Sequence, residues 1–262
     1  MVERDAEVAA VWSTIVTGDA DAFAARVLTF DLGAYTPPQL LALLASPAHP
    51  AHPAHPGQEA GRALPAPPTP PAGLAPDPQE VWAAGAEEME IAFRTLLRNR
   101  LAYGGLLTAD AGQLQLGEAG RGLASRWYPH TLRRRILTIR YIADHLTPIA
   151  FVEGDGMAIL RTHADTPHLV VFLDPPYTAG VQGKRAGRRL YTHWALDHEE
   201  LFRLAASVRG EVLMTYDDTP EVRALAAHHG FLTRPVRMKT THHVQTTELL
   251  ISRSFDWLEG PA

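Results

Sequence analysis

The sequence predicts an α/β protein built on a mostly parallel β-sheet with helices on both faces. Its C-terminal half contains four strand-like segments and a weaker fifth, at residues 149–155, 170–177, 211–218, 247–253 and 235–241. Runs of consecutive apolar residues, as in VVFL, are typical of strands buried on both faces. Helical patterns at 198–210 and 219–230 separate the later strands, and this alternation favours parallel pairing through helical connections.

The N-terminal half is predicted to be helical and to contain one long loop. Within residues 1–45, apolar residues recur at helical spacing from Val8 to Ile15, and two further short helices follow. Residues 46–78 are rich in proline and contain three Ala-His-Pro repeats. They have too few bulky apolar residues to form a core, so we expect a flexible loop and interpret its histidines as linker residues rather than metal ligands.

Residues 79–147 are predicted to form two longer helices joined by a loop. The first ends at Gly104-Gly105, and the second, from Thr131, has isoleucines on one face and arginines on the others. The GEAGRG segment between them, 117–122, has only a superficial similarity to a phosphate-binding loop, because no strand precedes it.

Composition narrows the class of protein. The chain has 262 residues, of which 46% are hydrophobic and 20% charged, and it has no cysteine. The hydrophobic content indicates a globular fold, and the lack of thiols excludes disulfides and cysteine chemistry. With no evident signal peptide or membrane-length apolar run, we expect a soluble, cytoplasmic protein.

Charge points to nucleic acid despite a formal net charge of −5. Three stretches contain basic residues and no acid: 119–143, 175–196 and 222–247. Clustered Lys and Arg provide most of the affinity for phosphate backbones, so the charge pattern indicates contact with nucleic acid, and the family resemblance described below implies that this partner is double-stranded DNA.

The most informative motif is Asp174-Pro175-Pro176-Tyr177, directly after the apolar run VVFL. Two consecutive prolines cannot continue a central strand, so they stop it at Asp174 and leave carbonyl acceptors without nearby N–H donors. The Asp174 carboxylate and the Pro175 carbonyl can each accept an N–H from a conjugated amine such as adenine N6, which localises the nitrogen lone pair. Tyr177 can stack on the base, and the chemistry needs positioning more than a strong base.

These residues resemble the Dam-like family of adenine-specific DNA methyltransferases. The similarity runs from Ile149 to Arg253 through VVFLDPPY, GRRLYTHW and TELLISRS, and extends more thinly to AFRTLLRNRLAYGGL and to residues 2–19. It implies a Rossmann-like sheet that uses S-adenosylmethionine, with an inserted, mainly helical target-recognition region. Accordingly, 1–45 and 148–262 form the catalytic domain, 46–78 a flexible loop and 79–147 the recognition region.

The resemblance also implies roles for individual residues. The catalytic motif is Asp174, Pro175, Pro176 and Tyr177. The cofactor ligands are Glu3 for the ribose hydroxyls, Asp155 with Gly156 for the adenine amine, and Asp174. Residues expected near DNA, from the resemblance and the basic stretches, are Asn99, Arg100, Arg121, Arg126, Arg133, Arg134, Lys184, Arg185 and Tyr191. We expect no metal site, because no acid converges on the His228-His229 or His242-His243 pair in the sequence, and Asp217-Asp218 is interpreted as a cap or pocket wall.

One family feature is missing. Family members begin with a strand and a glycine-rich loop that holds the methionine end of the cofactor, whereas the first matching segment here is the second strand, which ends near Glu3. The chain is therefore expected to be half of a split enzyme whose small protein partner supplies these parts, to have a start recorded too far downstream, or to be a relic without catalysis. The intact motif residues favour the first two.

Two functional alternatives stay open. One is an amino-methyltransferase for another base, such as cytosine N4 or a guanine amine in RNA. The other is a catalytically incomplete, DNA-binding subunit, which would bind DNA in a salt-dependent manner without responding to the cofactor.

Overall fold

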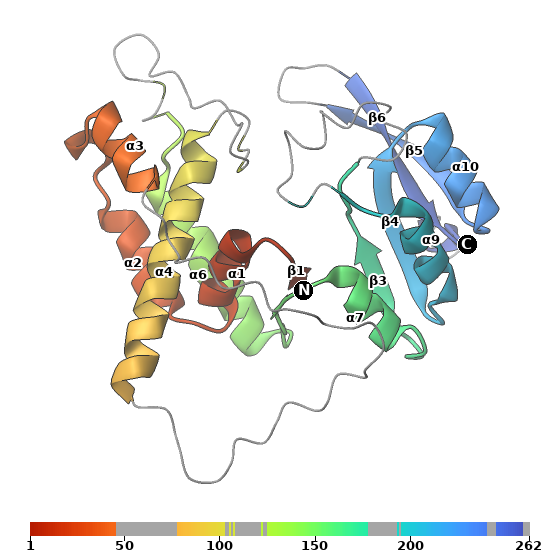
Figure 1. Cartoon of the computed structure of the whole chain (residues 1–262), viewed down its shortest axis with the longest axis horizontal. Helices are drawn as coiled ribbons and strands as arrows, with labels where there is room; N and C mark the ends of the chain where they lie inside the picture. The colour runs from red at the N-terminus through yellow and green to blue at the C-terminus, as the bar shows by residue number, and fades with distance from the viewer. Residues whose placement is uncertain are drawn as a thin grey trace. The chain divides into compact units, whose positions relative to one another are not determined.

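The computed structural model describes residues 1–45, 78–102, 105, 107, 122, 125–177, 193, 195–239 and 245–258. The chain divides into two compact units, Met1–Gly154 and Asp155–Ala262. Each unit has its own hydrophobic core, and each is described by itself. In Figure 1 the helices of the first unit run from red to light green, and the strands and helices of the second from green to blue.

The first unit is mainly helical. Its helices are α1 (Ala6–Val16), α2 (Ala20–Thr29), α3 (Pro37–Ala45), α4 (Pro78–Leu101) and α6 (Pro129–His145), with a short 3-10 turn, η1 (Leu32–Ala34). Helix α4 packs along α1, and α2 packs along α6. The side chains of Phe30, Phe93 and Trp127 meet edge to face, with ring centroids 5.1–6.3 Å apart. This aromatic cluster lies in the core of the unit.

Two aspartates and one glycine set the starts of the first helices. Asp5 accepts a hydrogen bond from the backbone N–H of Glu7, and Asp19 accepts one from that of Ala22, so both act as N-caps. Gly18 lies between α1 and α2, where a Cβ would sit only 3.0 Å from the backbone of Thr14. The predicted helical segments of residues 1–45, 79–101 and 131–145 are confirmed.

A small parallel pair of strands completes the first unit. Strand β1 (Val2–Glu3) pairs with β2 (Val152–Glu153). The backbone N–H of Gly154 donates to the carbonyl of Glu3 at 2.8 Å. The predicted strand at 149–155 is therefore present only as these two residues of β2.

The second unit is a sheet with helices. Its elements are α7 (Gly156–His163), β3 (Val170–Leu173), α9 (His198–Ser207), β4 (Glu211–Asp217), α10 (Pro220–His228), β5 (Leu232–Lys239), β6 (Gln245–Ser252) and the 3-10 turn η4 (Asp256–Leu258). The strand order is β3-β4-β6-β5. Strands β3 and β4 are parallel, and the other two pairings are antiparallel. The sheet is thus mixed rather than mostly parallel.

The two faces of β3 differ in burial. Val171 and Leu173 pack against the core formed by the sheet with α9 and α10. Val170 and Phe172, which point to the other face, are 74% and 61% exposed. Among the described residues of the second unit, this face of β3 stays exposed, so the expectation that helices cover both faces is wrong for this strand.

Helix α7 was not predicted from the sequence. It begins at Asp155, whose carboxylate accepts a hydrogen bond from the backbone N–H of Met157 at 3.0 Å. None of the helices in the described ranges is long and apolar enough to span a membrane.

Candidate active site at the carboxyl end of β3

The Asp174 carboxylate is fixed by two donors from its own unit. Strand β3 ends at Leu173, which pairs with Met214, so Asp174 lies beside Thr215 of β4. The Thr215 hydroxyl donates to Asp174 Oδ1 at 2.6 Å, and the Tyr177 hydroxyl donates to the same oxygen at 3.0 Å. Neither bond uses Oδ2, which leaves that oxygen as an acceptor for a ligand N–H.

Tyr177 is held by a stack of aromatic rings. Its ring lies against that of Tyr216, with centroids 5.8 Å apart and an angle of 23° between the planes. Burial raises the pKa of both phenols well above its usual value, so both hydroxyls stay protonated at neutral pH and Tyr177 can donate to Asp174. The Tyr216 hydroxyl in turn lies 2.9 Å from Nδ1 of His198, whose pKa burial lowers. This chain of contacts joins the motif to the start of α9.

Asp217 provides a second acceptor at the same edge of the sheet. It is the last residue of β4, and its Oδ1 is buried without a hydrogen-bond partner among the residues that the structure describes. Burial raises the pKa of this carboxyl above its usual value. Its neighbour Asp218 is instead bound by Arg223 through two hydrogen bonds of 2.6 and 2.8 Å. A buried oxygen without a donor is the kind of group that a ligand N–H satisfies. Asp217 thus adds to the acceptor character predicted for this edge.

The acids assigned to the cofactor suit the polar groups of an adenosine moiety. Glu3 Oε1 accepts hydrogen bonds from the N–H groups of Arg4 and Asp5, and Asp155 Oδ1 caps α7. In each case the second carboxylate oxygen is outside these bonds and can accept from a hydroxyl or an amine. A Cβ on Gly156 would meet nothing within 4 Å, so space alone does not require glycine there.

The fit to S-adenosylmethionine is therefore partial. Glu3 belongs to the first unit, and Asp155, Gly156 and Asp174 belong to the second. The described residues contain no glycine-rich loop that would hold the methionine end of the cofactor.

The residues expected near DNA fall into three groups. Asn99 donates to the Gly105 carbonyl at 2.5 Å, and Arg100 donates to the Arg126 carbonyl at 3.0 Å, so both hold the end of α4 to the segment that follows. Arg133 and Arg134 are exposed on α6, next to the exposed Arg135, and are available to phosphates. Arg126, also among the expected residues, is partly buried beside Arg100, and the other four, Arg121, Lys184, Arg185 and Tyr191, lie outside the described residues.

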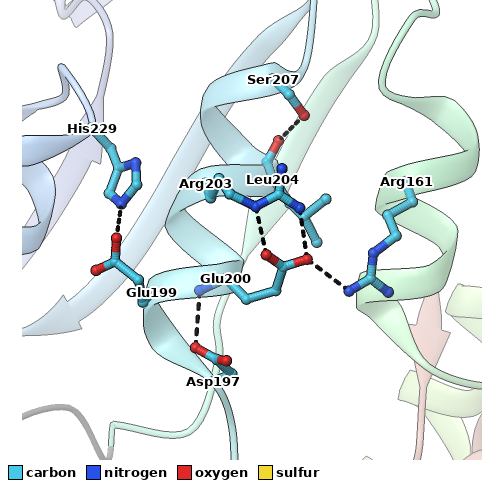
Figure 2. Close-up of polar contacts among 8 residues, drawn as sticks. All are labelled: Arg161, Asp197, Glu199, Glu200, Arg203, Leu204, Ser207 and His229. Atoms are coloured by element: carbon cyan, nitrogen blue, oxygen red, sulfur yellow. Dashed lines mark hydrogen bonds and ion pairs between the residues drawn. The ribbon is translucent and has the colours of Figure 1, made fainter.

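Two arrangements were not predicted from the sequence. One is the bond from Thr215 to Asp174, because a threonine in EVLMTYDD is indistinguishable from any strand residue. The other is the approach of Glu199 to His229, which Figure 2 shows beside a second acid, Glu200. The reason given for expecting no metal at the His228-His229 pair was therefore wrong, because an acid does converge on it. Glu200 itself is bound by Arg203 and Arg161, whose hydrogen bonds lower its pKa to about 2.

No protein-family model and no curated protein sequence matches this chain. Among solved structures, it is similar to the crystal structure of a "putative RNA methyltransferase" from Pyrococcus horikoshii, with 18% sequence identity over 51% of this chain and 69% of that one. The TM-score of this superposition is 0.27, so it carries no argument about the activity of this chain.

Proposed function

We propose that this chain is an S-adenosylmethionine-dependent methyltransferase that modifies adenine N6 in double-stranded DNA. The observation that carries the proposal is the fixed carboxylate of Asp174, oriented by Thr215 and Tyr177 at the point where two prolines stop β3. The resemblance to the Dam-like family supports the choice of adenine, and the exposed arginines of α6 support contact with DNA.

The residues of the motif position the target amine. A base flipped out of the duplex would donate one N6 proton to Asp174 Oδ2 and the other to the Pro175 carbonyl, which localises the nitrogen lone pair. Tyr177, already packed on Tyr216, would offer a ring to stack on the base. When bound, S-adenosylmethionine supplies the methyl group: the N6–C bond forms as the S–C bond breaks, and N6 releases a proton to solvent.

In the second unit, the carboxylate oxygen of Asp155 that does not cap α7 would accept from the adenine amine of the cofactor, with Gly156 beside it. The resemblance assigns the ribose hydroxyls to Glu3, whose bonds from the N–H groups of Arg4 and Asp5 use only Oε1. The methionine end requires donors that the described residues do not provide, and a small protein partner with a strand and a glycine-rich loop would supply them.

The open face of β3 supports such a partner. Strand β3 pairs with β4 alone among the described residues, and Val170 and Phe172 are exposed. Strands in parallel sheets are normally buried on both faces, so an added parallel strand with its helix would remove these side chains from water. Replacing Phe172 with Lys should then weaken cofactor-dependent activity of the complex. Equal activity would count against the partner.

The test is mass spectrometry of nucleosides from DNA of a methylation-deficient host that expresses the chain, with candidate partners co-expressed. We expect N6-methyladenine with the natural chain and with Asp165→Ala, an exposed acid after α7, and none with Asp174→Ala. DNA binding should survive in all three. Retained methylation in Asp174→Ala would refute the mechanism.

Other products would identify other functions. N4-methylcytosine or a methylated guanine in RNA would assign the same motif to another base. Salt-dependent DNA binding without any methylated product, with and without the partner, would indicate a catalytically incomplete subunit.

A further inference from the structure

Three side chains of types that can bind metal lie close together where α9 and the end of α10 meet. Glu199 lies in the first turn of α9, His228 is the last residue of α10, and His229 follows it. One ligand atom from each of the three lies within 4.8 Å of the other two. Figure 2 shows the Glu199 carboxylate of α9 and the ring of His229, which follows α10, pointing toward each other.

The contacts hold this group together without a metal. His229 Nε2 lies 2.8 Å from Glu199 Oε1, and the His228 and His229 rings meet edge to face at 4.8 Å. The His229 ring also packs on Phe202, with centroids 6.1 Å apart, and its side chain is only 11% exposed. His229 is therefore fixed, whereas the side chains of Glu199 and His228 are exposed and can adjust.

From this geometry we propose that Glu199, His228 and His229 form a Zn²⁺ site that links α9 to α10. Two imidazole nitrogens and one carboxylate oxygen are a donor set that zinc favours, with water as the fourth ligand. Calcium and magnesium prefer oxygen ligands alone, so the two histidines select against them.

The required movement is small. Zinc bonds of about 2.0–2.2 Å at tetrahedral angles put ligand atoms about 3.3 Å apart. Glu199 Oε1 and His229 Nε2 must therefore separate by roughly half an ångström, and the proton on Nε2 must move to solvent or to Nδ1 of the same ring so that the Nε2 lone pair can bind the metal. His228 moves closer by a rotamer change at the exposed end of α10.

The neighbouring acid shows why Glu199 is the ligand. Glu200 is next to it on α9, but Arg203 and Arg161 bind both of its oxygens at 2.6–2.9 Å. Glu199 has the histidine as its partner instead. Glu200 is therefore a matched control for charge on the same helix turn.

The test is a calorimetric titration of the full chain with Zn²⁺, after treatment with chelator and without a polyhistidine tag. We expect one equivalent to bind to the natural chain, and binding at least about tenfold weaker in His228→Ala and Glu199→Gln. Glu200→Gln and His163→Ala, which replaces an exposed histidine of α7, should bind as the natural chain does. Replacing His49, His52 and His55 together with Ala tests whether the Ala-His-Pro repeat binds the zinc. This variant should still bind one equivalent of Zn²⁺.

A second readout is thermal unfolding, because a metal that binds only the folded form stabilises it. Zn²⁺ at a hundred times the Kd of the natural chain should raise the midpoint by about 5 °C in the natural chain and by at most about half as much in His228→Ala. Undiminished zinc binding in His228→Ala would overturn the proposal. So would the loss of zinc binding in the variant that lacks His49, His52 and His55. Neither readout depends on methyl transfer, so the site and the proposed function fail separately.

Discussion

Replacing Thr215 with Val tests whether the second donor to Asp174 orients the motif. The substitution keeps the β-branched shape, which suits strand β4, and removes the hydroxyl that donates to Asp174 Oδ1 at 2.6 Å. Tyr177 is then the remaining donor to that oxygen, at 3.0 Å. The carboxylate gains freedom to rotate, and Oδ2 spends less time in the position that accepts the target amine.

The size of the effect follows from the bond and its exposure. A hydrogen bond to a charged group contributes about 1.5–3 kcal/mol. Because Asp174 is exposed, water replaces part of the lost interaction, so the lower end applies. About 1.5 kcal/mol corresponds to a roughly tenfold fall in the rate of methyl transfer. Stability should change by less than about 1 kcal/mol, since Val fits the same place in the strand.

The assay compares initial rates of N6-methyladenine formation at saturating DNA and cofactor, together with denaturant unfolding of each variant. Thr215→Ser keeps the hydroxyl and should restore most of the rate, which a purely structural role for Thr215 would not predict. The double variant Thr215→Val with Tyr177→Phe should lose more than the product of the single losses, because both donors share one oxygen. A Thr215→Val enzyme within twofold of the natural rate would refute the reasoning.

Three further predictions concern the second unit. Gly210→Ala should destabilise it by about 4 kcal/mol or more in denaturant unfolding, because the new Cβ would lie 1.9 Å from the Leu169 carbonyl oxygen. Arg253→Ala should lower the unfolding free energy by about 2–3 kcal/mol, since the guanidinium donates to three backbone carbonyls at 2.7–3.1 Å. Glu200→Gln should remove an acid-sensitive contribution to stability. The pKa of Glu200 is lowered from 4.5 to about 2, so this contribution is present above pH 4.5 and is lost as the pH falls toward 2. The difference in thermal midpoint between the natural chain and Glu200→Gln should shrink over that window.

The elements of the fold could be predicted from local signals. Two prolines cannot extend a strand, and β3 does end at Leu173. Asp5 and Asp19 precede apolar periodic segments, and each caps a helix in the structure. Such features depend on neighbours in the sequence, which is why the boundaries of most helices lie close to the expected ones.

The same local signals can be ambiguous. An aspartate after a strand can bind a ligand or cap the next helix, and the sequence favoured only the first for Asp155. In the structure its Oδ1 caps α7, which explains why that helix was missed. The cap does not use Oδ2 of Asp155, so the same residue can cap α7 and still accept the predicted hydrogen bond from the cofactor.

Contacts across elements could not be predicted. Thr215 meets Asp174 only because Val171 of β3 pairs with Val212 of β4, and a shift of one residue would place another side chain there. Glu199 and His229 are 30 residues apart and meet because α9 and α10 pack on the same face of the sheet. The first contact depends on strand register and the second on helix packing. Neither can be recognised from the pattern of residues in a single sequence.

The sequence of β3 and the exposure of its residues point to different environments for this strand. An edge strand with one face in water would alternate apolar and polar residues, yet VVFL is apolar at every position. Val171 and Leu173 are partly buried against the core, whereas Val170 and Phe172 are exposed. Burying a large apolar side chain lowers the free energy by roughly 1.5–3 kcal/mol relative to leaving it in water. Covering Val170 and Phe172 would therefore be favourable. The sequence of β3 is therefore typical of a strand whose two faces are both covered, which is the state that the proposed partner strand would produce.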